Sequence, residues 1–141
     1  MGSALALGSR TVLAVWLASA TLAQAQEPLS EAGTSTIGYR SVAAALADLR
    51  GRPGVEESEQ AGWPVFLDRG ADGASVTLWS FAPAGHPAFP AVAKRQLSSV
   101  SGKTFLSMSI ACEAEKAPCD ALVRSFERLN AQLSESLNAQ P

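Results

Sequence analysis

The chain has 141 residues, of which 47% are hydrophobic and 17% are charged, and its formal net charge at pH 7 is −2. Its 11 basic residues are scattered and are outnumbered by 13 acidic ones, so no concentrated positive charge is available to hold nucleic acid or an anionic membrane surface. We therefore expect neither partner, and the length suits one domain.

Residues 1–25 have the features of a secretory signal peptide cleaved after Ala25. Arg10 precedes a largely apolar run of twelve residues, 11–22, and Ala23 and Ala25 supply the small side chains that a signal peptidase requires. A membrane anchor is the alternative, but a helix needs about 20 apolar residues to cross a bilayer. We therefore expect an exported chain that is not inserted in the membrane after cleavage, with ten basic and thirteen acidic residues and a net charge of −3.

Residues 26–36 are polar, contain Pro28 and Gly33 and show no periodicity. Such a composition cannot bury enough apolar surface to order the backbone, so it predicts a flexible leader. A single domain is expected over residues 37–141.

The domain begins with a pattern typical of a helix. Val42, Ala45 and Leu49 recur at helical spacing, Ser41 is a suitable N-cap, and glycine and proline follow from Gly51 onward. The pattern predicts a short, alanine-rich N-terminal helix from Val42 to Arg50.

Between Val55 and Glu113 the hydrophobic period changes to two, which is typical of strands. Ala61-Gly62, the segment DRGADG and Ser101-Gly102 are suited to turns between antiparallel strands. The predicted strands are VEESEQAG, WPVFLD, ASVTLWSF, AVAKRQLSSV and KTFLSMSIACE. In the last of these, the even-numbered residues from Thr104 to Cys112 are expected to face the core.

A long C-terminal helix of about twenty residues is predicted by one apolar stripe with Pro118 in its first turn. The stripe consists of Leu122, Phe126, Leu129, Leu133 and Leu137. The fold class is therefore α+β. We expect an antiparallel meander sheet of about five strands, covered on one face by the short N-terminal helix and the long C-terminal helix.

Cys112 and Cys119 are the only cysteines, and an even count in an exported chain favours a disulfide. A reactive thiol at Cys119, near the start of the last helix, is the alternative. The spacing of the two cysteines differs from that of thiol-disulfide oxidoreductases, so we expect a structural bridge between the last strand and the last helix.

The run LWSFAPAGHPAFP, residues 78–90, carries the candidate contact residues Trp79, Phe81, His86 and Phe89. Its three prolines each fix φ and remove a backbone donor, so the segment predicts a stiff corner between two strands. The aromatic side chains either pack beneath this corner or line a groove for a ligand or partner, and the sequence favours packing.

His86 is the only histidine, and catalysis by histidine requires an orienting carboxylate or a nucleophile, neither of which adjoins it in the sequence. One histidine and two bridged cysteines are too few ligands for a typical zinc centre. We therefore assign no catalytic residue, no metal and no cofactor. Lys94 and Arg95, and Arg124 and Arg128 four apart on the last helix, have the charge to hold an anion, but we interpret them as ordinary surface charge.

The runs GYRSVAAALADL, LWSF, GHPAFP and VAKR, with the spacing of the two cysteines, resemble a group of small exported proteins of Gram-negative bacteria, some of which have chaperone-type names without a supporting motif. The resemblance implies a periplasmic location and a single domain. The expected function is a non-enzymatic binding or interaction module with an unidentified protein or small-molecule partner. A chaperone-like or envelope-stress protein, or a small hydrolase that uses His86, is the alternative.

Overall fold

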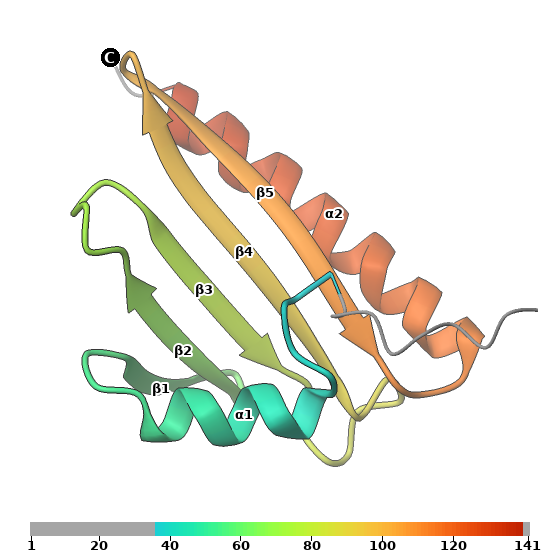
Figure 1. The fold of residues 1–141 in the computed structure, drawn as a ribbon. Helices are drawn as coiled ribbons and strands as arrows, with labels where there is room; N and C mark the ends of the chain where they lie inside the picture. Colours follow the sequence, from blue (N-terminus) through green and yellow to red (C-terminus); the bar gives the residue numbers. More distant parts are fainter. Residues whose placement is uncertain (1–35, 140–141) are drawn as a thin grey trace, which may run out of the picture.

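The computed structural model describes residues 36–139, so the predicted signal peptide and nearly all of the predicted leader lie outside the described residues. Five strands lie between two helices in the sequence (Figure 1). The elements are α1 (Val42–Gly51), β1 (Glu56–Gln60), β2 (Trp63–Arg69), β3 (Val76–Phe81), β4 (Ala91–Val100), β5 (Lys103–Cys112) and α2 (Lys116–Asn138).

The strands form one antiparallel sheet in the order β1-β2-β3-β4-β5, which confirms the α+β class and the five-stranded meander. The turn between β4 and β5 places Ser101 and Gly102 at φ angles of 51° and 76°, the left-handed conformation that a two-residue hairpin requires at both positions. Local turn chemistry therefore sets the register of the two longest strands.

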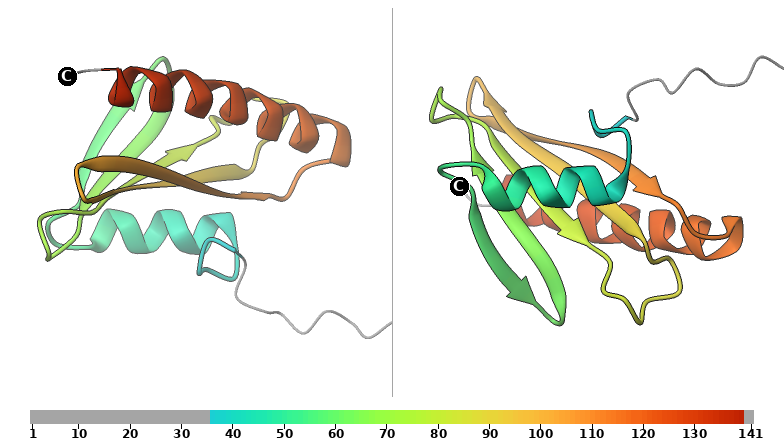
Figure 2. Two further views of the ribbon diagram at one scale, coloured as in Figure 1. Left: turned by 90° about the horizontal axis from the view of Figure 1, so that it is seen from above. Right: turned by 60° about the horizontal axis from the view of Figure 1, so that its bottom comes forward.

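The two helices lie on opposite faces of the sheet, so the prediction that both cover one face is wrong (Figure 2). The cause lies in consecutive buried residues in the central strands. Val65 is 2% exposed and its neighbour Phe66 is fully buried, although alternation sends their side chains to opposite faces. A sheet that is apolar on both faces needs a layer on each side.

The first layer is α1. Its N-cap is Ser41, whose hydroxyl accepts a hydrogen bond from the Ala44 N–H at 3.1 Å. The Val42 N–H donates to Glu113 Oε1 at 2.7 Å, and this bond joins the start of the helix to the end of β5. The core on this side consists of Ile37, Val42, Ala45, Leu49, Phe66, Trp79, Phe81 and Val92.

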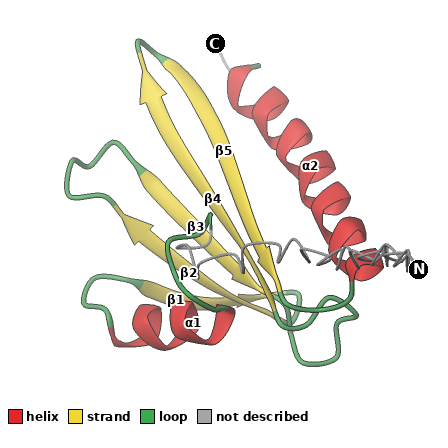
Figure 3. Cartoon of the chain, turned by 45° about the vertical axis from the view of Figure 1, so that its right-hand side comes forward, coloured by secondary structure: helices red, strands yellow, loops and turns green. Residues whose placement is uncertain are grey.

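The second layer is α2, which packs mainly along β5 (Figure 3). Leu122 and Phe126 are its buried residues, and they contact Ala91, Ala93 and partly buried Ile110. The predicted disulfide is confirmed: Cys112, the last residue of β5, is bonded to Cys119 in the first turn of α2, with 5.8 Å between their Cα atoms. The bridge therefore holds the start of α2 against the sheet.

Candidate functional site

A groove of about 320 Å³ lies between α2 and the adjoining strands, and we call it the α2 groove. It exists because a helix is about 10 Å wide and strands are about 4.8 Å apart, so one helix covers roughly two strands of a five-stranded sheet. The side chains that form most of its wall come from β2, β3, β4 and α2: Trp63, Val65, Ser80, Arg95, Phe126 and Leu129.

Arg95 is the unusual member of this wall. Alternation along β4 places it on the same face as Ala93, between α2 and the sheet, where it is only 7% exposed. Its Nη2 donates to Ser80 Oγ at 3.3 Å, and its guanidinium carbon lies 5.3 Å from the centre of the Phe126 ring. Within residues 36–139, no carboxylate pairs with Arg95 and no acceptor takes the hydrogen of its Nε.

Burial lowers the pKa of Arg95 from its ordinary value because the charged form loses hydration. Arginine nevertheless remains protonated in proteins, since its ordinary pKa lies far above neutral pH. The α2 groove is therefore a largely apolar site with one positive charge in its wall. A charge removed from water without a partner carries a large desolvation cost, which an incoming anion would offset.

A second cavity, of about 240 Å³, adjoins the α2 groove and shares Trp63, Ser125 and Phe126 with it. Trp63 lies between the rings of His86 and Phe126, with centroid separations of 5.0 and 5.8 Å and edge-to-face geometry. The rest of this cavity is formed by Pro87 and the first turns of α2. Trp63 therefore marks the point at which the two cavities meet.

His86 occupies the wall of this second cavity with its ring held by the backbone. Its Nδ1 accepts a hydrogen bond from the Ala88 N–H at 3.1 Å, which leaves Nε2 as the protonated nitrogen of the neutral ring. In the part of the chain that the structure describes, no carboxylate, hydroxyl or thiol forms a hydrogen bond with His86.

The four candidate contact residues of the proline-rich segment are not brought together. Trp79 and Phe81 are each 3% exposed and belong to the core beneath α1. His86 lines the second cavity on the opposite side of the sheet, and Phe89 is 47% exposed. They separate because the alternation of β3 directs Trp79 and Phe81 toward α1, whereas His86 belongs to the loop that follows β3.

Arg95 was interpreted as surface charge, and the structure shows it to be buried. A signal was present in the alternation of β4, where Ala91, Ala93, Arg95 and Leu97 share one face. A charged residue within an otherwise apolar set indicates either an error in the predicted strand or a buried charge. Without knowledge of what covers that face, the sequence does not distinguish the two.

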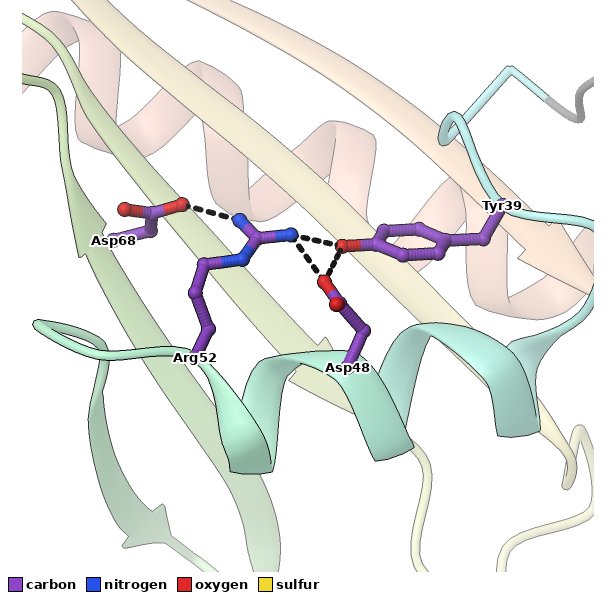
Figure 4. A network of polar contacts seen from close by, with 4 residues as sticks. All are labelled: Tyr39, Asp48, Arg52 and Asp68. Atoms are coloured by element: carbon purple, nitrogen blue, oxygen red, sulfur yellow. Dashed lines mark hydrogen bonds and ion pairs between the residues drawn. The ribbon is translucent and has the colours of Figure 1, made fainter.

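A separate polar network joins α1 to the sheet on the other side of the molecule (Figure 4). Arg52 donates to Asp48, to the Tyr39 hydroxyl and, at 2.8 Å, to Asp68, while the Tyr39 hydroxyl donates to Asp48. Burial and the hydrogen bond to Asp48 raise the pKa of Tyr39, and the hydrogen bonds from Tyr39 and Arg52 lower the pKa of Asp48. These groups satisfy one another, so the network is a structural clamp.

Over residues 36–139, no three His, Cys, Asp or Glu side chains are placed to hold a metal ion. None of the helices in that range is both long and apolar enough to cross a bilayer. The chain was compared with protein-family models, with curated proteins and with solved structures, and none of them matches it.

Proposed function

We propose that the protein is a non-enzymatic binding module that holds a small, largely apolar molecule in the α2 groove. The observation that carries this proposal is the composition of the groove: aromatic and aliphatic walls with a few polar groups, Ser80 and Arg95, at a fixed position. Small-molecule sites in proteins have this composition, and their volumes begin at about 300 Å³.

The proposed location is the periplasm, where the module is stabilised by one disulfide. The bond between Cys112 and Cys119 supports an oxidising compartment. The signal peptide predicted for residues 1–25 supports export.

Two alternatives have weaker support. A hydrolase that uses His86 needs a nucleophile or an acid beside the ring, and the ring nitrogen Nδ1 is instead bonded to the backbone. A chaperone-like role needs a contiguous exposed apolar surface. The exposed aromatic residues Phe89 and Phe105, at 47% and 53%, lie in a loop and in β5. Phe105 lines a cavity with Leu137, and an exposed apolar surface of two side chains is within the normal range for a protein surface.

The proposal is tested by titrating the protein lacking residues 1–25 with decanol, a neutral apolar probe, while two-dimensional ¹H–¹⁵N NMR spectra are recorded. The indole N–H of Trp63 should shift because Trp63 lines the groove, whereas that of Trp79, buried under α1, should not. Saturable shifts confined to residues outside both cavities, or no shifts at all, would contradict the proposal.

A matched pair of variants on α2 locates the bound probe. Leu129 lines the groove and is 45% exposed, so Leu129→Trp should narrow the groove without disturbing the core. Leu137 is similarly exposed, at 37%, and lies nearer the end of the helix, where it lines a separate cavity with Phe105, so it also controls for binding outside the α2 groove. Leu129→Trp should weaken decanol binding, and Leu137→Trp should leave it unchanged.

A further inference from the structure

Resting on the proposed function, we infer that the ligand of the α2 groove is an apolar monocarboxylate of the fatty-acid class, with its carboxylate paired with Arg95 and its tail directed along the groove toward His86.

The need for an anion follows from how the arginines of the domain are paired. Arg50, Arg52 and Arg69 are partly or largely exposed, and each has a carboxylate partner. Arg40, Arg124 and Arg128 have none among residues 36–139, but all three are exposed to water, which solvates their charge. Arg95 is buried far more deeply than the other arginines, and it has no carboxylate partner among residues 36–139. An ion pair on the surface contributes little to stability, whereas leaving a buried charge without its partner is strongly destabilising. The ligand is therefore the partner that the described part of the domain does not supply.

A carboxylate fits the charge of the groove better than a phosphate does. Among the described residues, Arg95 is the only charged one in the wall, and one guanidinium neutralises one negative charge. Its planar arrangement of donors matches the two oxygens of a carboxylate. A phosphate group carries up to two charges and several acceptor oxygens, and phosphate sites usually gather further cations or backbone N–H groups around them.

The remainder of the ligand is expected to be apolar and elongated. Trp63, Val65 and Phe126 form the walls next to Arg95, and the groove joins a second cavity of about 240 Å³ at Trp63. The polar side chains Gln60 and Ser125 are exposed and lie at the rim. A peptide would bring backbone groups that need partners inside the groove. Of the residues that the structure describes there, Ser80 is the only buried one with an uncharged polar side chain. A hydrocarbon chain has no such requirement.

The test compares decanoate, decanol and decyltrimethylammonium, which share a chain but differ in charge, by calorimetric titration at pH 7.5 with NMR to locate the bound probe. Decanoate should bind the wild-type protein about tenfold to a hundredfold more tightly than decanol, the range expected for hydrogen bonds to a charged group. Decyltrimethylammonium should bind more weakly than either, because its charge repels Arg95.

Three variants assign the effect to Arg95. Arg95→Met should reduce decanoate affinity to about that of decanol, so that the preference for the carboxylate disappears. Arg95→Lys retains the charge without the planar fork and should give an intermediate affinity for decanoate. Arg128→Met, an exposed substitution on α2, should change neither the affinity for decanoate nor the affinity for decanol. Should Arg95→Met not fold, the wild-type comparison and Arg95→Lys still decide the question.

The outcomes separate this inference from the proposed function. Equal binding of decanol and decanoate in the groove would overturn the pairing with Arg95 and leave the binding module in place. Binding of none of the three probes would overturn both. Tighter, Arg95-dependent binding of an apolar tripeptide with a free carboxyl terminus would overturn the fatty-acid class.

Discussion

Arg95→Met is expected to make the unliganded protein more stable, although it removes the residue proposed to recognise the ligand. Methionine matches the length of the arginine stem and fills irregular apolar space. The substitution removes a buried charge for which no carboxylate partner is present among the described residues, and the desolvation cost of such an ion amounts to several kcal/mol. Residues selected for binding commonly lower stability in this way.

The change in the free energy of unfolding is the difference between the desolvation cost that Arg95→Met removes and the contacts of Arg95 that it loses. The bond from Nη2 to Ser80 Oγ is long, at 3.3 Å, so its contribution lies near the lower end of about 1.5–3 kcal/mol. The contact with the Phe126 ring contributes about 1 kcal/mol. Relief of several kcal/mol of desolvation therefore leaves a net gain of about 1–2 kcal/mol.

The assay is thermal and urea unfolding followed by circular dichroism, without ligand. For a domain of about 100 residues, the expected gain raises the midpoint of thermal unfolding by roughly 4–12 °C. Arg128→Met, on the exposed side of α2, is the control and should stay within about 0.5 kcal/mol of the wild type. A loss of more than about 1 kcal/mol in Arg95→Met would show that Arg95 is needed for the fold, and would refute the reasoning.

Three further predictions concern the bridge, the core and the polar clamp. Replacing Cys112 and Cys119 together by serine should lower the free energy of unfolding by about 2.5 kcal/mol, measured by urea titration, because the closed loop no longer restricts the unfolded chain. In the same assay Phe66→Ala should cost about 3–5 kcal/mol, since Phe66 is fully buried, whereas Phe105→Ala, 53% exposed, should cost less than about 0.5 kcal/mol. Because the pKa of Asp48 is lowered in the folded state, its contribution to stability is complete above about pH 4 and is lost as the pH falls below that value. In Asp48→Asn, the free energy of unfolding should therefore fall less between pH 4 and pH 2 than it does in the wild type. An acid-unfolding profile identical to that of the wild type would contradict the clamp.

Local chemistry was sufficient to predict the strands, the meander and the disulfide. The alternation of residues 103–113 and the Ser101-Gly102 turn are short-range signals, and the structure places β4, the turn and β5 accordingly. The cysteine pair could be predicted because Cys112 and Cys119 are the only two cysteines of a chain with the features of an exported protein. Each of these features depends on residues that are neighbours in the sequence.

The layer arrangement was predicted incorrectly because it depends on which face of the sheet each helix covers. The consecutive buried residues Val65 and Phe66 could have shown that both faces are covered. That signal is weaker than a hydrophobic period, since a short apolar run is also compatible with a segment of a buried helix.

The sequence by itself determined the elements of this protein, because hydrophobic periods, turn residues and caps act between residues that are close along the chain. Only the tertiary structure decided the site. Arg95 in β4, Trp63 in β2 and Phe126 in α2 meet because α2 is tied to the end of β5 and covers only part of one sheet face. The proline-rich segment contributes His86 to one end of that site, while Trp79 and Phe81 fill the core on the other side of the sheet.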